Sequence, residues 1–181
     1  VWKKTRIIYV NELDDIRARA KDVYVSGNYA YVVYKVLTED GHRTGIQTFK
    51  ISDDPQNPVL KGECGTPEQF SLGLSGLVER EQGIVVHNGQ AYITDYSNGL
   101  AVYDVDDPEN PTHEAWGLMQ YALDVAISDG FVYVAVGGYG LWMLPLVADN
   151  NTPDDAINSE VIRVCQYNEG LTLSSAVEID G

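Results

Sequence analysis

The segment Ala122-Leu-Asp-Val-Ala-Ile-Ser-Asp-Gly-Phe-Val-Tyr-Val-Ala135, followed closely by Gly140-Leu141, contains the pattern that recurs along the chain. It consists of an apolar segment, a turn with glycine, a second apolar segment and a glycine that opens the next segment. Copies of this pattern occur at residues 20–33 with 45–46, at residues 84–93 with 99–100, and at residues 174–181. Recurrence of this kind predicts a repeat protein whose units stack on one another.

Each repeat is predicted to contain four antiparallel strands. In the first copy these strands are expected at residues 23–25, 29–36, 45–51 and 59–64. Tyr133 follows Tyr92 by 41 residues, and a period of about 40 residues with four strands is typical of a β-propeller blade. Several strands, such as Phe131–Val136, are apolar on both faces, which indicates strands that lie between two neighbouring sheets.

We therefore predict an all-β fold, a β-propeller with about three four-stranded blades plus flanking strands of an incomplete or longer ring. Residues 1–181 are assigned to one propeller domain, with a blade-edge strand at 1–19, blades at about 20–64, 84–116 and 122–168, and the start of a further blade at 174–181. Because propellers have at least about four blades, the remaining blades are expected from the same longer chain or from another copy. The alternative is a β-sandwich, which does not need a repeat of this length.

The repeat also resembles a known family. The motifs Asp-Val-x-Val-x-Gly-x-x-Ala-Tyr-Val, Gly-Leu-x-Val-x-Asp-Val and Asp-Pro-x-Asn-Pro, spread over residues 20–168, are similar to those of the LVIVD-repeat β-propellers. The resemblance implies a scaffold that is secreted or located at the cell surface, without an assigned reaction. The chain departs from the pattern where Gly83 stands in place of Asp22 and Asp124, and where Pro145-Leu146 ends a strand.

The net charge of −15 is unevenly distributed. From residue 81 onward there are 16 acidic residues and one basic residue, Arg163. Such a surface repels phosphate backbones, so nucleic acid is not expected as a partner. It suits an extracellular, cell-surface or periplasmic medium, or alternatively a cation or a basic partner. No run of 18 apolar residues occurs, so no membrane span is expected in this segment.

Two insertions are predicted on one face of the propeller, where repeat scaffolds often bind partners. The first, Val36–Thr44, contains His42 and Arg43. The second, Gly65–Gln82, supplies apolar side chains for a partner protein at Phe70, Leu72, Leu74 and Leu77. Alternatively, these side chains fold back and cover the adjacent blade.

A third insertion, Ala148–Ile157, carries oxygen ligands that suit Ca²⁺, at Asp149, Asn151, Asp154 and Asp155. It lacks the EF-hand spacing, so a solvated Asx-rich loop is the alternative. No other cofactor is predicted.

Several polar residues are expected to be structural. Asp22 and Asp124 at the start of innermost strands either cap backbone N–H groups between blades or bind a ligand in the central channel. The Asp-Pro-x-Asn-Pro turns stabilise their own backbone. Cys64 and Cys165 have no metal-ligand spacing, and their expected positions at outer edges two blades apart do not favour a disulfide.

The function expected from this pattern is a non-catalytic extracellular or cell-surface scaffold for protein binding or surface assembly. No nucleophile and base are paired, and the three histidines do not share metal-ligand spacing. An alternative is a hydrolytic or metal-dependent enzyme with its site in the channel of the whole ring. A second alternative is carbohydrate binding on aromatic platforms such as Trp116 or Tyr139.

Overall fold

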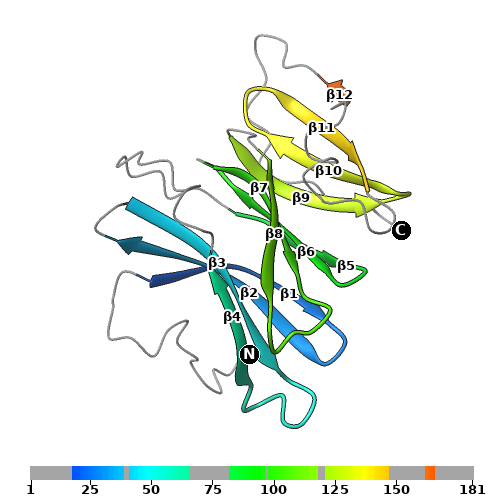
Figure 1. Ribbon diagram of the computed structural model, residues 1–181. Coiled ribbons are helices and arrows are strands. Elements are labelled where there is room, and N and C mark those ends of the chain that lie inside the picture. The colour runs from blue at the N-terminus through cyan, green and yellow to red at the C-terminus, as the bar shows by residue number, and fades with distance from the viewer. Residues whose placement is uncertain are drawn as a thin grey trace, which may run out of the picture.

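The computed structural model describes residues 18–38, 41–65, 82–96, 98–117, 121–146 and 162–165. These residues form three four-stranded sheets in which every strand pairs with its neighbours in chain order (Figure 1). Blade 1 consists of β1 (Ala18–Ser26), β2 (Tyr29–Thr38), β3 (Gly41–Lys50) and β4 (Val59–Gly65). Blade 2 consists of β5 (Ile84–His87), β6 (Gln90–Asp95), β7 (Gly99–Asp104) and β8 (Thr112–Gly117). Blade 3 consists of β9 (Ala122–Ser128), β10 (Phe131–Val136), β11 (Gly140–Pro145) and β12 (Ile162–Cys165).

The predicted all-β fold with three four-stranded propeller blades is thus confirmed. The flanking segments predicted at 1–17 and 174–181 lie outside the described residues. Cys64 and Cys165 lie on β4 and β12, the outermost strands of blades 1 and 3. In the described part of the chain, no helix is long and apolar enough to cross a bilayer.

Tight two-residue turns fix the register of the innermost strands. The turns Asn88-Gly89 and Asp129-Gly130 have positive φ at both central residues, 47° and 74° in the first and 50° and 78° in the second. Such turns are of type I′, whose twist matches that of the paired strands, and Asn-Gly and Asp-Gly are favoured because they tolerate positive φ. The repeat sequence therefore dictates these hairpins locally.

The first insertion, which the sequence predicted between the second and third strands, forms part of these strands. The pairing of β2 with β3 continues through Val36↔Arg43 and Leu37↔His42 to Thr38↔Gly41. The extra residues on both sides of the connection therefore lengthen the hairpin, because each added residue gains a ladder partner. His42 and Arg43 belong to a strand of blade 1.

The sides of the blades meet in two apolar layers. We call the side of a blade that faces the preceding blade its incoming face, and the opposite side its outgoing face. Blade 1 contributes Tyr31, Val33 and Ile46 to the first layer, which also contains Ile93 and Tyr103 of blade 2. The second layer joins the outgoing face of blade 2 to the incoming face of blade 3 through the buried residues Tyr92, Leu100, Val102, Ala115, Val125, Val132, Val134 and Leu144. Burial on both faces explains why these strands lack simple alternation.

Polar bridges between innermost strands accompany the apolar layers. The carboxylate of Asp22 accepts hydrogen bonds from the backbone N–H of Val23, at 2.8 Å, and of Ile84 in blade 2, at 3.0 Å. This confirms for Asp22 the predicted capping between blades. Gly83 has no side chain to repeat this bridge toward blade 3, and a Cβ on Gly83 would lie 2.3 Å from Oδ1 of Asp124.

Thr94 replaces the missing bridge between blades 2 and 3. Its hydroxyl accepts a hydrogen bond from the N–H of Gly83 at 2.7 Å and donates one to the carbonyl of Leu123 at 3.1 Å. The departure from the repeat at Gly83 is therefore accommodated by a side chain on the neighbouring strand.

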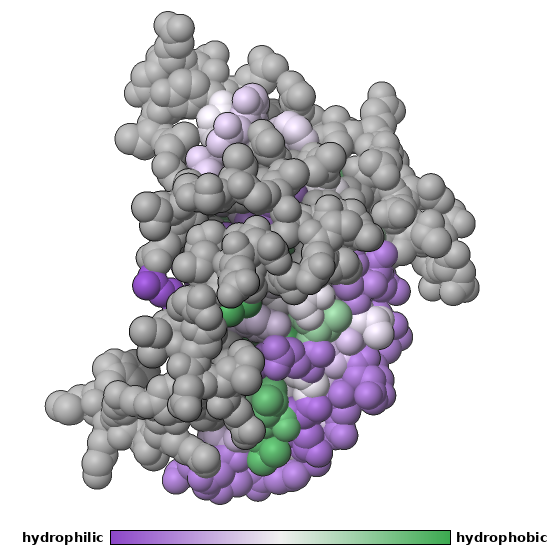
Figure 2. Space-filling view, turned by 60° about the vertical axis from the view of Figure 1, so that its left-hand side comes forward, coloured by the Kyte–Doolittle hydropathy of each residue, from purple (hydrophilic) through white to green (hydrophobic). Residues whose placement is uncertain are grey.

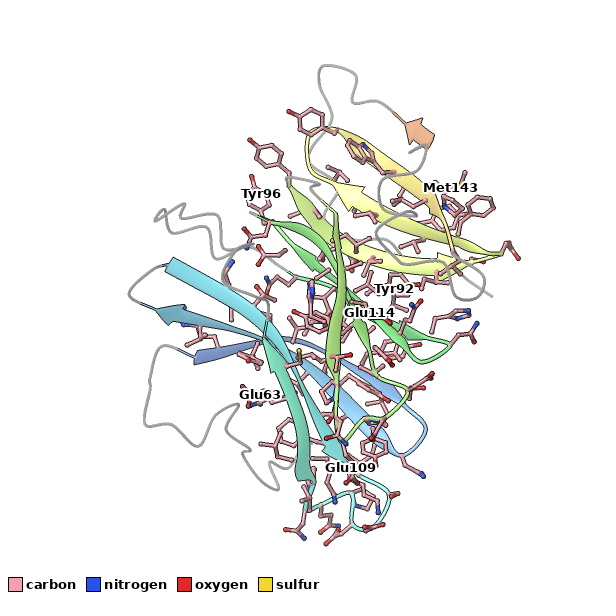
Figure 3. The ribbon with its side chains drawn as sticks, in the orientation of Figure 1. Glu63, Tyr92, Tyr96, Glu109, Glu114 and Met143 are labelled. Atoms are coloured by element: carbon pink, nitrogen blue, oxygen red, sulfur yellow. The ribbon has the colours of Figure 1, made fainter. Side chains whose placement is uncertain are left out.

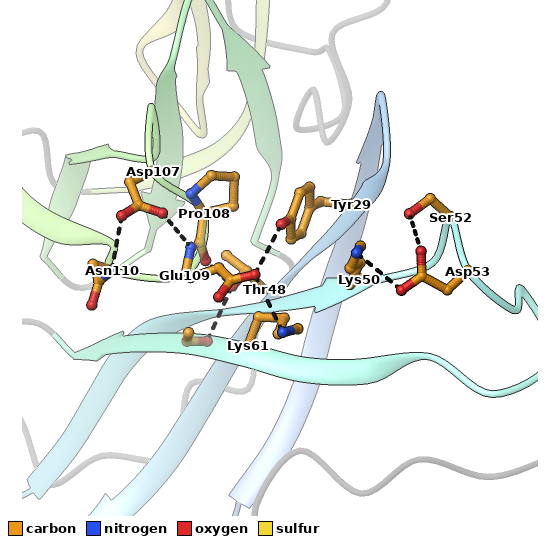
Figure 4. Close-up of polar contacts among 11 residues, drawn as sticks. Tyr29, Thr48, Lys50, Ser52, Asp53, Lys61, Asp107, Pro108, Glu109 and Asn110 are labelled. Carbon is orange, nitrogen blue, oxygen red and sulfur yellow. Dashed lines mark hydrogen bonds and ion pairs between the residues drawn. The ribbon is translucent and has the colours of Figure 1, made fainter.

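The Asp-Pro-x-Asn-Pro turn of blade 2 packs against blade 1 (Figure 4). Within the turn, Asp107 accepts hydrogen bonds from Nδ2 of Asn110 at 2.8 Å and from the N–H of Glu109 at 3.0 Å. These bonds, from Asn110 first and then from Glu109, hold the pKa of Asp107 below its ordinary value. The hydroxyl of Thr48 in blade 1 donates to the carbonyl of Pro108. The turn is therefore structural, as predicted, and it also joins two blades.

Because several tyrosines are buried, we expect the free energy of unfolding to fall at alkaline pH. Burial raises the pKa of Tyr31 and Tyr34, and raises that of Tyr92 to about 12. Below about pH 10 both the folded and the unfolded chain keep these protons, so the stabilisation is complete. Above that pH the unfolded chain releases protons that the folded chain retains, and the free energy of unfolding falls as the pH rises. Thermal unfolding between about pH 9 and about pH 12 measures the fall.

The variant Tyr92→Phe supplies the control for this titration. It removes one of the retained protons, so its stability is expected to fall less steeply over the same pH interval. An identical slope for Tyr92→Phe and the original chain would contradict the assignment to Tyr92.

Candidate functional site

One face of the three blades gathers the features that suit binding. It is formed by the turns between the second and third strands and by the connections that enter each first strand, and we call it the turn face. In Figure 1 these strand ends point to the left. Figure 2 turns that side toward the viewer, and there the described surface is mostly hydrophilic with small hydrophobic areas. Two groups of side chains on the turn face stand out, one polar and one aromatic.

The polar group lies between blades 1 and 2, and we call Lys35, Thr44, Gln82, Asp95 and Asn98 the polar cluster. Nζ of Lys35 lies 3.5 Å from Oδ1 of Asp95, and the two side chains are only 10% and 1% exposed. The hydroxyl of Thr44 donates to Oδ2 of Asp95, and Nδ2 of Asn98 lies 3.2 Å from the same oxygen. Nε2 of Gln82 donates to Thr44 at 3.1 Å. A buried carboxylate is thus held by one charge and several hydrogen bonds.

Two acceptors in the polar cluster remain open. Within the described part of the chain, the buried amide oxygens of Gln82 and Asn98 have no hydrogen-bond partner. Their amide orientation follows from the network, since each amide nitrogen faces an acceptor. The ammonium of Lys35 beside Asp95 disfavours a bound cation. Chemically, the open oxygens suit a buried water or another neutral hydrogen-bond donor.

The aromatic group lies between blades 2 and 3, and we call Tyr96, Tyr121 and Tyr139 the tyrosine cluster. The ring of Tyr121 meets the edge of Tyr96 at a centroid distance of 5.1 Å and stacks on Tyr139 at 5.7 Å with an interplanar angle of 27°. Tyr121 and Tyr139 are 36% and 50% exposed. Figure 3 labels Tyr96 at the left-hand ends of the strands of blades 2 and 3. Exposed tyrosines of this kind are common anchors in protein interfaces.

The backbone holds Tyr121 in a strained conformation. Its φ of 72° is in the left-handed region, which is unusual for a bulky residue. The N–H of Tyr121 donates to the carbonyl of Tyr96 at 2.7 Å, and its carbonyl accepts from the N–H of Gly137 at 2.9 Å. These bonds fix the residue between the two neighbouring turns. The ring is therefore presented to solvent from a rigid support.

A third feature lies away from the turn face, on the incoming face of blade 1. Among the described residues, Val23 and Val25 of β1 are the most exposed large hydrophobic side chains, at 57% and 59%. Val23 borders a hollow of about 340 Å³ with mainly apolar walls, lined by Ala20, Lys21, Asp22, Val23, Ala30, Val32, Phe49 and Pro58. An exposed apolar surface with a hollow of this kind is typical of a site that binds another protein surface.

The structure places only some of the residues predicted from sequence. The expected calcium ligands Asp149, Asn151, Asp154 and Asp155 lie outside the described residues, as do Phe70, Leu72, Leu74 and Leu77. The side chains of His42, Arg43 and Trp116 are likewise outside the description. Tyr139, named as an aromatic platform, is exposed and belongs to the tyrosine cluster. In the part of the chain that the structure describes, no three His, Cys, Asp or Glu side chains group as metal ligands.

Sequence reasoning missed the polar cluster and most of the tyrosine cluster. Lys35 and Asp95 are 60 residues apart, and no local pattern joins them. A usable signal was present for Lys35, because a lysine inside the apolar strand 29–37 requires a buried partner. Tyr96 and Tyr139 both follow an innermost hairpin, so aligning the repeats would have placed them on the same face.

Comparison with known families identifies the repeat. The family described as the LVIVD repeat matches residues 18–37, 81–114 and 120–144. These segments contain the whole of β1, β5, β6, β7, β9 and β10 and part of β2, β8 and β11. No curated protein and no solved structure matches the chain significantly.

Proposed function

The chain belongs to the LVIVD-repeat family of β-propeller proteins, and from this premise we propose that it is a non-catalytic extracellular, cell-surface or periplasmic scaffold that binds protein. The exposed incoming face of blade 1 carries this proposal. The acidic composition, with a net charge of −15, supports a location outside the cytoplasm. Recovery of the protein in the secreted, surface or periplasmic fraction of the cells that make it checks the location.

Comparison of the three blades indicates what the exposed face fits. Val23 has the same position in blade 1 as Ile84 in blade 2 and Val125 in blade 3. Ile84 and Val125 are 6% and 5% exposed because a preceding blade covers them, whereas Val23 is 57% exposed. Val32 is likewise half-buried, although its counterpart Ile93 is fully buried. The surface that suits this face is therefore the outgoing face of a further blade of the same repeat type.

The turn of blade 1 that ends in Pro58 sets a further requirement for the blade that docks on this face. In blade 2 the turn that ends in Pro111 abuts Gly62 on the outer strand of blade 1, where a Cβ would lie 2.5 Å from Cδ of Pro111. The matching turn of blade 1 ends in Pro58, which lines the hollow. The docking blade must therefore have glycine or another small residue at the position of Gly62. Blade 3 has Ile162 there, opposite Met143, so a second copy offering blade 3 fits poorly.

A four-blade chain tests whether the incoming face of blade 1 receives the outgoing face of a further blade. A duplicate of residues 18–81, carrying Val23→Lys and Val25→Lys, is inserted directly before Ala18 of the full chain. The duplicate is expected to cover the original Val23 and Val25, to lower the fluorescence of a bound apolar dye and to raise the unfolding temperature by several degrees. Each buried valine adds about 1 kcal/mol when it leaves water, and stability of this size is measurable in a domain of this length.

The matched control carries the same duplicate with Gly62→Leu in the added blade, which fills the space that the turn at Pro58 needs. It is expected to leave the dye fluorescence at the level of the original chain. Equal dye binding by both extended chains would refute docking of a blade. A dimer of the original chain that Val23→Lys abolishes would assign the face to a second copy and overturn the proposal, and Val59→Lys, at a position that is 55% exposed and outside the hollow, controls for added charge.

A further inference from the structure

The net negative charge of the chain comes from residues 81–181, the half that contains the tyrosine cluster. Residues 1–80 contain 11 basic and 11 acidic residues, whereas residues 81–181 contain one basic and 16 acidic residues. Within the described residues, blades 2 and 3 carry eight acidic residues and one basic residue, whereas blade 1 carries four acidic and six basic residues, so the negative field arises from blades 2 and 3. Such a field attracts cationic partners and accelerates their association, mainly at low salt.

The stacked pair within the tyrosine cluster offers a short-range contact for the same kind of partner. Tyr139 packs on Tyr121 and is 50% exposed. A guanidinium group placed over a tyrosine face is attracted by the ring quadrupole and also stacks with the ring plane. Because the backbone N–H and carbonyl of Tyr121 are both hydrogen-bonded to neighbouring turns, the pair is pre-organised and loses little freedom on binding.

We infer that the tyrosine cluster binds an arginine-containing basic segment of a partner protein, with a guanidinium stacked on Tyr139. At low salt the negative charge of blades 2 and 3 attracts the basic segment from a distance, and the rings supply the short-range contact on the turn face. A sugar is a poorer ligand for this surface, since sugar sites need several open polar groups beside the ring, and the amide oxygens of the neighbouring polar cluster are buried. This site is separate from the incoming face of blade 1 and stands independently of it.

Fluorescence anisotropy with the full chain tests the inference. The probe is a labelled peptide of alternating arginine and glycine, and the comparison peptide carries citrulline in place of each arginine. The arginine peptide is expected to bind at about 20 mM NaCl and to weaken markedly at about 300 mM NaCl, where screening is strong. Citrulline keeps the shape and loses the charge, so its peptide is expected not to bind.

Variants of the rings locate the site. Tyr139→Ala is expected to weaken binding of the arginine peptide about fivefold, whereas Tyr139→Phe keeps a π face and retains binding. Tyr121→Gly is also expected to weaken binding, because it removes the ring on which Tyr139 stacks, while relief of the positive φ offsets part of the stability that is lost with the ring. In Tyr139→Ala, loss of binding without loss of stability separates a contact role from a structural one.

Three outcomes would overturn the inference. The first is equal binding of the arginine and citrulline peptides. The second is unchanged affinity in Tyr139→Ala and Tyr121→Gly, which would assign binding to the acidic surface alone. The third is binding of a linear glucan oligosaccharide that depends on Tyr139 when the arginine peptide does not bind, which would make the cluster a sugar platform.

Discussion

Replacement of Lys35 by methionine is expected to lower the free energy of unfolding by about 3 kcal/mol, since removing one partner of a buried ion pair leaves the other charge uncompensated. The partner, Asp95, is 1% exposed and lies 3.5 Å from the ammonium. Thr44 and Asn98 also donate to this carboxylate, and hydrogen bonds alone do not replace a missing charge. Equilibrium unfolding in urea measures the loss.

Two further variants separate the buried charge from other effects of losing a lysine. The double variant Lys35→Met with Asp95→Asn keeps the shape of the pair without either charge, and it is expected to recover more than half of the loss. Lys61→Met removes a similar lysine that lies 3.2 Å from Glu109, but these side chains are 31% and 46% exposed. Its expected effect is below about 1 kcal/mol. Equal losses for Lys35→Met and Lys61→Met would contradict the importance of burial.

The second large effect is expected for Gly62→Val, which should destabilise the chain by about 3 kcal/mol through overpacking between blades 1 and 2. A Cβ at Gly62 would lie 2.5 Å from Cδ of Pro111 and 2.6 Å from the carbonyl oxygen of Pro108. The carbonyl belongs to a turn that its own hydrogen bonds hold in place, so it cannot move aside without breaking them. Thermal unfolding detects the change as a lower midpoint.

Gly65→Val provides the control on the same strand. A Cβ there would find its nearest described neighbour, the hydroxyl of Tyr34, at 3.6 Å, which is ordinary van der Waals contact. The expected change is within about 0.5 kcal/mol. If Gly62→Val and Gly65→Val had similar midpoints, close packing of the Asp-Pro-x-Asn-Pro turn on blade 1 would not be a source of stability.

The polar bridges between blades show which contacts could be predicted from the repeat and which could not. For Asp22 the sequence predicted either a cap between blades or a ligand of the central channel, and the hydrogen bond from the N–H of Ile84 shows the cap. The replacement of the second bridge by Thr94 was not predictable, since the hydroxyl contacts Gly83 in its own blade and Leu123 in the next. A partner on a different strand has no fixed spacing in sequence, and only packing brings it into range.

The first insertion illustrates a different limit. The sequence correctly showed that residues 36–44 exceed the repeat, but it gave no sign that they would extend the β2–β3 ladder. Polar residues such as Thr38 and His42 suit an exposed strand as well as a loop. Pairing between them depends on register, which the turn and the strands set together.

The repeat, the four-stranded blades, the hairpin turns and the acidic character of the second half all follow from the amino-acid sequence. These features are local, because periodicity, turn chemistry and charge act over a few residues at a time. Only the tertiary structure decided which side chains meet at blade boundaries: Lys35 with Asp95, Thr94 with Leu123, and Tyr121 with Tyr139. Those contacts depend on how neighbouring sheets stack, and stacking also leaves Val23 exposed where its counterparts Ile84 and Val125 are buried.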